Sequence, residues 1–269
     1  KGAGIISSLF TVTISGFFAF ASSLDHVGIL TRNVEDAAIV TDVLKGKDEN
    51  DMTTLKTDRT EYSTHLEDSI KGKKLFYIKE ICNLEEYSKQ STELKETLSD
   101  FKILLDKCRE LGFIVEEVSI DKKSLETIYP TYMTISCAEA TSNNSNLTGI
   151  LFGPRPKADN VDDLMIKART KGFSELIKRR FILGSYILQK ENQEKLFLNA
   201  GRVRRIIVDK INELFEKYDG MILPASGGPA PKIEGTTEEL TDDEVVLENH
   251  LAIANFGGMP SITIPFTMI

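Results

Sequence analysis

Apolar positions recur along this chain at two spacings, and the two spacings alternate. Between residues 91 and 111 they recur every three or four residues and stop at Gly112, which predicts an amphipathic helix. The short apolar runs 75–78 and 113–120 on either side of it predict strands. Strand, helix and strand in that order form a βαβ unit. We therefore expect an α/β fold whose mainly parallel mixed sheet is flanked by helices.

The remaining periodic segments extend this pattern along the sequence. Helices are expected over residues 33–46, 124–147, 161–190, 192–217 and 241–256, and strands over 221–223 and 262–266. In the first of these helices we expect Asn33 as the N-cap, Gly46 as the end, and an inward stripe of Ala37, Val40, Val43 and Leu44. No internal repeat or low-complexity tract divides the chain, so we expect one domain over residues 1–269.

The stretch from Gly2 to Leu24 carries no charge and lies between Lys1 and Asp25. Its length and apolar character alone would allow a signal peptide or a short membrane span. Its several Ser and Thr residues and Gly16 are instead typical of a buried strand followed by a turn. We therefore predict a buried strand and turn here rather than a membrane segment.

Composition narrows the possible functions. With 269 residues, 41% of them hydrophobic, the chain can bury a large core. Its 33 Lys and Arg against 41 Asp and Glu give a net charge of -8, which is a poor basis for binding nucleic acid without a partner. The three Cys form no CxxC pair and the three His no HxxxH or HExxH motif. We therefore expect no disulfide framework, no metal site and a reducing compartment.

Several sequence blocks together resemble one family. Residues 20–38 hold a Ser-Ser pair, an Asp, a Gly expected in a turn and the capped helix. Residues 218–224 run Tyr-Asp-Gly-Met-Ile-Leu-Pro, and 255–265 follow the pattern Asn-x-x-Gly-x-Pro-x-x-x-x-Pro. In this order the blocks resemble the amidase signature enzymes. Blocks at 136–153 and 172–184 resemble in particular the branch of that family formed by the A subunits of glutamyl-tRNA(Gln) amidotransferases. The resemblance spans nearly the whole chain and implies the amidase signature fold.

The resemblance also implies a catalytic set that these residues do not contain. Family members hydrolyse amides with a Ser nucleophile, a second Ser in a cis peptide and a Lys, with a loop that ends in Gly-Gly-Ser-x-Arg-x-Pro. No Gly-Gly-Ser-x-Arg occurs here, and Gly227-Gly228 is followed by Pro229. We therefore expect the catalytic Lys and two Ser upstream of Lys1. The chain would then be the C-terminal part of an amidase, truncated at its N-terminus and inactive alone.

Ser22 and Ser23 are the other candidates for chemistry. No Lys is near them in the sequence, so they do not complete the family's catalytic set. We interpret them as core residues behind the substrate site that hydrogen-bond with Asp25, rather than as nucleophiles.

Arg204 is the leading candidate for substrate binding. At about 100° per residue it points within the apolar stripe of the 192–217 helix, whereas Arg202 and Arg205 point away from it. A guanidinium on a buried face requires an anion. That anion is either an internal carboxylate or a substrate carboxylate, which an Arg grips with two parallel hydrogen bonds. The family's arginine for the α-carboxylate of glutamine falls at this position, which favours the substrate.

Glu248 is the second candidate for substrate binding. It lies inside a helix that is apolar nearly all round, and a buried carboxylate needs a cationic or amide partner. The family has an Asp here that holds the ammonium group of glutamine, and Glu is one methylene longer. A third family contact, a Tyr after Phe-Gly, is replaced by Pro154. That contact is therefore lost or is supplied by another residue such as Arg155.

The resemblance implies a glutaminase subunit of a tRNA-dependent amidotransferase, a heterotrimeric, ATP-dependent ligase of protein biosynthesis. Such a subunit hydrolyses glutamine to supply ammonia for converting Glu-tRNA(Gln) to Gln-tRNA(Gln). It further implies subunits B and C as partners, with ATP, Mg and most tRNA contacts on the partner subunit. We expect no cofactor on this chain, no membrane association, and a cytoplasmic location, or a mitochondrial one in a eukaryote. Two alternatives stay open: another amidase signature hydrolase, or a non-catalytic binding or assembly protein on the same fold, tethered to a membrane through residues 2–24.

Overall fold

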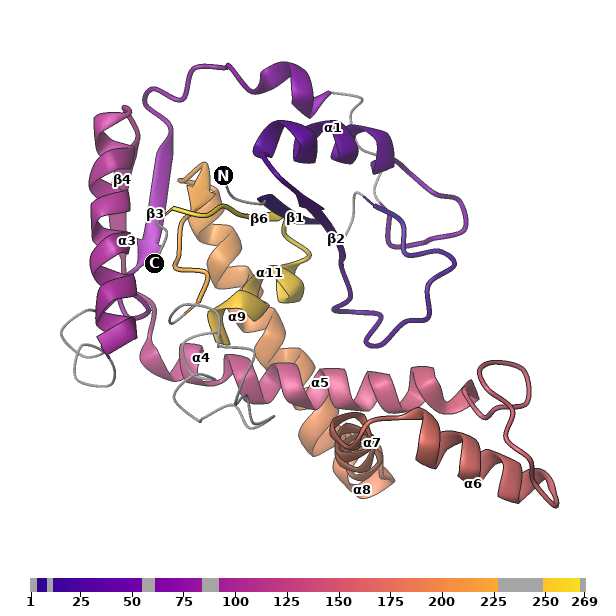
Figure 1. The fold of residues 1–269 in the computed structure, drawn as a ribbon. Helices are drawn as coiled ribbons and strands as arrows, with labels where there is room; N and C mark the ends of the chain where they lie inside the picture. The colour runs from indigo at the N-terminus through magenta and orange to yellow at the C-terminus, as the bar shows by residue number, and fades with distance from the viewer. Residues whose placement is uncertain (1–3, 9–11, 55–60, 84–91, 227–248, 267–269) are drawn as a thin grey trace. The chain divides into compact units, whose positions relative to one another are not determined.

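The computed structural model describes residues 4–8, 12–54, 61–83, 92–226 and 249–266 (Figure 1). The chain divides into two compact units. Unit 1 comprises residues 1–13, 26–129 and 205–269, and unit 2 comprises residues 14–25 and 130–204. Two of the four boundaries between the units fall inside helices, α5 (Ile128–Asn143) and α9 (Asn199–Phe215), and the other two follow residues 13 and 25. The expectation of one domain over residues 1–269 stays a prediction.

Unit 1 combines strands with helices, which confirms the predicted α/β class. Its strands are β1 (Gly4–Ser8), β2 (Val27–Thr31), β3 (Lys74–Ile78), β4 (Ile114–Val118), β5 (Gly220–Met221) and β6 (Ser261–Thr263). Its helices are α1 (Val34–Leu44), α3 (Thr92–Glu110), α4 (Lys122–Glu126) and α11 (Ala252–Gly257), with the first two residues of α5, most of α9, and the 3-10 turns η1 (Tyr62–His65) and η4 (Asn249–Leu251).

The strands of unit 1 form two three-stranded sheets. In one sheet β1 lies between β2 and β6 and is antiparallel to both. In the other, β3 lies between β4 and β5 and is parallel to both. The predicted βαβ unit is β3, α3 and β4, and α3 packs against β4 (Figure 1). The parallel sheet flanked by helices is therefore confirmed. The antiparallel sheet was not anticipated. One of its pairs, β1 with β6, joins segments that lie far apart in the sequence, although β1 and β2 are consecutive strands.

The core around the parallel sheet follows the predicted pattern closely. Phe76 is fully buried, and its ring centroid lies 5.6 Å from that of Phe215 and 5.1 Å from that of Tyr218. Helix α3 buries the predicted side chains Leu94, Leu98, Phe101, Leu105 and Cys108. Leu111 was expected on the same face but is exposed, because α3 ends at Glu110 and Gly112 then turns the chain with a φ of 100°.

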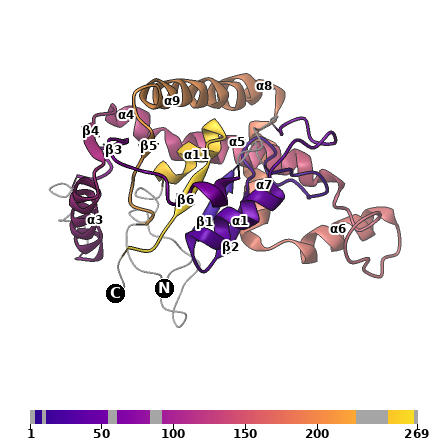
Figure 2. The same cartoon turned by 90° about the horizontal axis from the view of Figure 1, so that it is seen from above.

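Helix α1 begins as predicted but buries a different face. Asn33 is its N-cap and accepts a hydrogen bond from the N–H of Asp36. The buried side chains are Ala37, Ala38 and Thr41, whereas Val40 and Val43 of the predicted stripe are exposed. Figures 1 and 2 show α1 alongside β1 and β2. Small side chains let a helix pack closely against a sheet. The buried face of α1 is therefore explained by the size of its side chains and not by their hydrophobicity alone.

The uncharged N-terminal stretch contains the predicted strand, β1. Val12, after it, is buried, but Phe17 and Phe18 around the Gly16 turn are exposed. Gly28 was expected in a turn and instead lies within β2, paired with Ser7. In the part of the chain that the structure describes, no helix is long and apolar enough to cross a membrane.

The described part of unit 2 is helical. Besides its shares of α5 and α9, it contains η2 (Asn144–Asn146), α6 (Val161–Gly172), α7 (Glu175–Ile187), α8 (Lys190–Gln193) and the π-helical turn η3 (Glu194–Leu198). The predicted helix 161–190 is divided because Ser174 caps α7 by accepting the N–H of Ile177. The predicted helices 124–147 and 192–217 are each divided as well, into α4 and α5 and into α8, η3 and α9.

Unit 2 has its own core, where α5 and α7 approach closely. Cys137, Ala138 and Ile187 are buried together, and Leu196 and Phe197 pack against them. A Cβ at Gly184 of α7 would lie 2.0 Å from the carbonyl oxygen of Cys137, so only glycine fits at this crossing. The crossing fixes the position of α5, which carries side chains of the candidate site.

Candidate functional site

The candidate site of unit 2 starts with the turn that contains Ser22 and Ser23. The Asp25 carboxylate accepts hydrogen bonds from the backbone N–H groups of Phe20, at 2.8 Å, and Ala21, at 3.1 Å. These bonds close the turn on itself. The predicted hydrogen bonds between the two Ser and Asp25 are therefore wrong, because Asp25 is used by backbone donors. Ser22 is also exposed rather than in the core.

Helix α5 supplies the partners of the two Ser. The Glu139 carboxylate accepts the backbone N–H of Ser23 at 2.9 Å and its hydroxyl at 2.6 Å. One turn further along, the Asn143 amide donates to the Ser22 hydroxyl at 3.0 Å and to the Phe20 carbonyl at 3.2 Å. Residues four apart lie on the same face of a helix, so one face of α5 holds the whole turn.

Arg204 of α9 completes the cluster. Its Nη1 donates to the Ser23 hydroxyl and its Nη2 to the Ser23 carbonyl, both at 2.8 Å. Its side chain is half-buried, whereas Arg202 and Arg205 are exposed, as the helical spacing predicted. Burial lowers the pKa of the Arg204 guanidinium, and the negative charge of Glu139 opposes that shift. Its role as a substrate ligand stays a prediction.

Chemically, this cluster is suited to bind an anion. A half-buried guanidinium interacts more strongly with a carboxylate than an exposed one, because less water screens the pair. The Glu139 carboxylate accepts its hydrogen bonds from Ser23, so a neutral residue stands between that carboxylate and Arg204. We refer to Glu139, Ser23 and Arg204 together as the Arg204 brace.

Sequence reasoning did not identify Glu139 or Asn143. A signal was available, because Glu139 is the one charged residue in a run whose neighbours Cys137, Ala138 and Ala140 are buried. A carboxylate in such a run requires donors. The same argument was applied to Glu248, and that residue lies outside the described part of the chain.

The other predicted contacts lie apart from the brace in the sequence. Pro154 follows Gly153, which turns the chain with a φ of 79°, and Arg155 is exposed. In unit 1, the buried His250 hydrogen-bonds the Pro224 carbonyl at 2.7 Å, and Asn255 hydrogen-bonds His26 at 2.8 Å. These contacts involve the Tyr-Asp-Gly and Asn-x-x-Gly blocks and join η4 and α11 to segments that lie earlier in the sequence.

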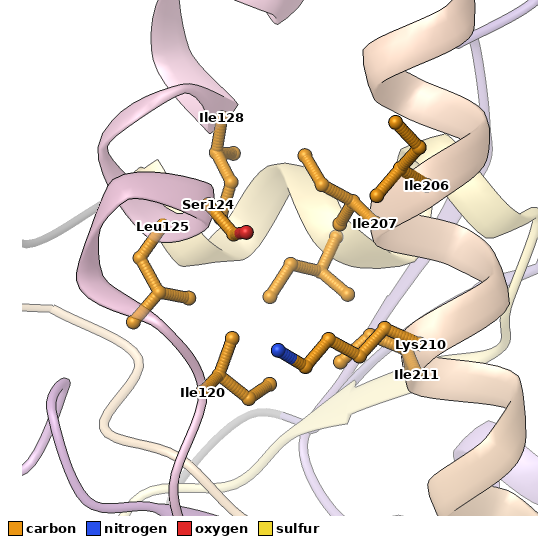
Figure 3. Close-up of a pocket in the computed structure, with 9 residues that line it drawn as sticks. Ile120, Ser124, Leu125, Ile128, Ile206, Ile207, Lys210 and Ile211 are labelled. Carbon is orange, nitrogen blue, oxygen red and sulfur yellow. The ribbon is translucent and has the colours of Figure 1, made fainter.

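A small pocket in unit 1 offers little chemistry. Figure 3 shows apolar side chains from residues 120–128, which include α4, facing apolar side chains of α9, with Lys210 and Ser124 as the polar groups in the lining. The apolar lining residues are Ile120, Leu125, Ile128, Ile206, Ile207, Ile211 and Ile253. This lining is typical of helix packing. Among the described residues, no group of three or more His, Cys, Asp or Glu is placed to hold a metal ion.

Comparison with known proteins agrees with the sequence blocks. A family model described as Amidase matches residues 3–269. The chain is 33% identical over 251 residues to the A subunit of the glutamyl-tRNA(Gln) amidotransferase of Pseudothermotoga lettingae, covering 93% of this chain and 51% of that protein. It is 34% identical over 252 residues to the corresponding A subunit of Thermotoga maritima, covering 93% and 50%. The chain thus spans about half the length of the curated relatives it matches.

Solved structures show the same fold. The crystal structure of the Thermotoga maritima protein superposes with a TM-score of 0.71 at 28% identity, over 99% of this chain and 52% of that one. A bacterial aryl acylamidase of the amidase signature family gives a TM-score of 0.73 at 16% identity, over 100% and 52%. The second likeness concerns the fold alone. Because the family model covers nearly every residue and both structures share the architecture, the chain belongs to the amidase family, with the amidase signature fold.

Proposed function

We propose that this chain is the glutamine-recognising part of the glutaminase subunit of a tRNA-dependent amidotransferase. The parent enzyme would hydrolyse glutamine and supply ammonia for converting Glu-tRNA(Gln) to Gln-tRNA(Gln). The observation that carries the proposal is the half-buried Arg204, oriented by Ser23 in a chain 33–34% identical to the A subunits of two such amidotransferases.

In the proposed reaction, Arg204 binds the α-carboxylate of glutamine and so places the side-chain amide. A Ser hydroxyl attacks the amide carbon, the C–N bond breaks, and the nitrogen takes up a proton and leaves as ammonia. Water then hydrolyses the glutamyl ester and releases glutamate. In this proposal the nucleophile, its relay Ser and the Lys lie outside these 269 residues, which is supported by the absence of a Gly-Gly-Ser-x-Arg run among them. This chain contributes binding and orientation.

Partners and location follow from the same proposal. Subunits B and C would complete a heterotrimer, with ATP and Mg on the partner that activates the tRNA-bound glutamate. A net charge of -8 supports placing most tRNA contacts on a partner, because binding phosphates requires clustered Lys and Arg. A cytoplasmic location, or a mitochondrial one in a eukaryote, belongs to the proposal as well.

The test measures ammonia released from glutamine by the chain alone and by the chain combined with the nucleophile-bearing half of an amidase. We expect no turnover from the chain alone and turnover from the combination. In the combination, Arg204→Ala should raise the KM for glutamine roughly a hundredfold, as expected for loss of a charge-assisted bidentate contact. Turnover by the chain alone would refute its inactivity. An unchanged KM in Arg204→Ala would refute glutamine recognition through Arg204.

Another amidase signature hydrolase is the second candidate. It is favoured by Pro154, which stands where the family's glutamine-binding Tyr is expected. A substrate without a carboxylate would not need Arg204, so Arg204→Ala would then leave substrate binding unchanged.

A further inference from the structure

We propose that Glu139 and Ser23 are positioning residues that hold the Arg204 guanidinium ready for a ligand α-carboxylate. They would thereby set the preference of the site for amino-acid amides over amides that lack the carboxylate. This inference rests on the proposed function. It adds two residues that sequence reasoning either missed or assigned to another partner.

The hydrogen bonds of the brace fix both the position and the orientation of the Arg204 guanidinium. Ser23 receives one hydrogen bond from each terminal nitrogen of the guanidinium, on its hydroxyl and on its carbonyl. Two bonds to one residue define both the position and the plane of the flat guanidinium. A single bond would leave it free to rotate.

Ser23 in turn is held by Glu139. The carboxylate accepts both the backbone N–H and the hydroxyl of Ser23, so the hydroxyl hydrogen points at Glu139. A lone pair of the same oxygen then faces Arg204. The Glu139 carboxylate therefore decides which way the Ser23 hydroxyl is oriented. Glu139 itself sits on α5 among buried neighbours, which limits its own freedom.

Positioning matters because an arginine side chain is long and flexible. Ordering it on ligand binding reduces affinity, and a side chain that is ordered beforehand avoids this loss. A ligand without a carboxylate gains nothing from an ordered guanidinium. The brace should therefore improve binding of carboxylate ligands selectively.

A role through charge and a role through positioning predict opposite changes in carboxylate affinity for Glu139→Gln. If Glu139 acted only through its charge, removing that charge would make the electrostatic potential at the site more positive and strengthen carboxylate binding. If Glu139 acts by positioning, the introduced glutamine keeps one acceptor oxygen and replaces the other with an NH2 donor, so it cannot hold both the backbone N–H and the hydroxyl of Ser23, and carboxylate binding weakens. Ser23→Ala removes the hydroxyl and leaves both charges in place, so weaker binding in that variant cannot come from a changed charge.

The experiment measures the dissociation constants of L-glutamine and of 4-aminobutanamide, which is glutamine without its carboxylate, by calorimetry with the full 269-residue chain. We expect Ser23→Ala and Glu139→Gln each to weaken L-glutamine binding at least tenfold and to leave 4-aminobutanamide binding unchanged. Ser23→Thr keeps the hydroxyl and should bind L-glutamine within twofold of the parent. The matched control is Glu175→Gln, since Glu175 is an acid of the same unit paired with Lys178 at the surface. It should change neither constant.

The outcomes separate the two proposals. If Arg204→Ala weakens L-glutamine binding but Glu139→Gln leaves it unchanged or strengthens it, the positioning role is overturned and the proposed function stands. If Arg204→Ala itself has no effect, the carboxylate site is wrong. Thermal unfolding identifies variants that fail to fold. If Ser23→Ala does so, the comparison of Ser23→Thr with Glu139→Gln decides the question.

Discussion

Gly184→Ala is the sharpest test of the packing in unit 2. The added Cβ would meet the Cys137 carbonyl oxygen at 2.0 Å and the Thr141 hydroxyl oxygen at 2.1 Å. Carbon and oxygen in contact need about 3.0 Å or more, so α5 and α7 must separate by roughly 1 Å at their crossing. That separation would loosen the core formed by Ala138 and Ile187.

The change in the free energy of unfolding caused by Gly184→Ala combines two opposing effects. Alanine is a better helix former than glycine by about 1 kcal/mol, which favours the variant. Overpacking a well-filled core costs about 1–3 kcal/mol and occasionally more, and a backbone carbonyl cannot move aside as a flexible side chain would. We expect a net loss of about 2 kcal/mol and a melting temperature lower by roughly 4–8 °C.

The assay is urea unfolding followed by circular dichroism, with Gly201→Ala as the matched control. Gly201 lies in helix α9 of the same unit, and a Cβ there would have nothing within 4 Å. That variant should gain about 0.5–1 kcal/mol from helix propensity alone. If Gly184→Ala is as stable as Gly201→Ala, the close crossing of α5 and α7 is wrong.

Three further predictions concern unit 1. Burial would raise the pKa of Asp42, but hydrogen bonds from Lys45 and from two backbone N–H groups outweigh it and hold that pKa well below its usual range. The ionised Asp42 therefore stabilises the folded state above about pH 4, and this contribution is lost as the pH falls further. The free energy of unfolding of Asp42→Asn should depend less on pH below about pH 4 than that of the parent. On α1, the exposed Val43→Ser should change stability by less than about 0.5 kcal/mol, whereas Ala38→Val should cost about 1–3 kcal/mol in urea unfolding; equal effects would contradict the observed face. Burial is the main cause, and the negative charge of Glu117 a smaller one, that raises the pKa of Cys82 to about 12. Iodoacetamide at pH 8 should therefore alkylate Cys82 at least about a hundredfold more slowly than free cysteine. An alkylation rate comparable to that of free cysteine would contradict the burial of Cys82.

The comparison of α1 with α3 shows which parts of the fold local sequence could predict. In α3 the apolar residues are large and lie on one face, so periodicity alone identified the buried side chains. In α1 the large residue Val43 faces outward and the small residue Ala38 faces the sheet. Hydrophobic spacing does not distinguish a close helix–sheet contact from an ordinary one. The antiparallel sheet was not predicted for a related reason, because the residues of each strand do not indicate which other strand it pairs with.

The candidate site was predicted in part. The half-burial of Arg204 followed from its angle on the helix, which depends only on helical geometry. Its partner did not follow, because Ser23 lies 181 positions earlier and contacts at that separation depend on the tertiary fold. Asp25 was assigned to the two Ser through sequence proximity, whereas its acceptors were already used by the backbone of its own turn.

The pairing of β1 with both β2 and β6 has a consequence for synthesis on the ribosome. Ile5 pairs with Leu30 and with Thr263, so one edge of β1 can be satisfied early and the other only when the final strand has been translated. Until then the nascent chain presents an open sheet edge, which is a template for unwanted association. Rapid completion of translation, or a chaperone that shields that edge, would protect the nascent chain from such association.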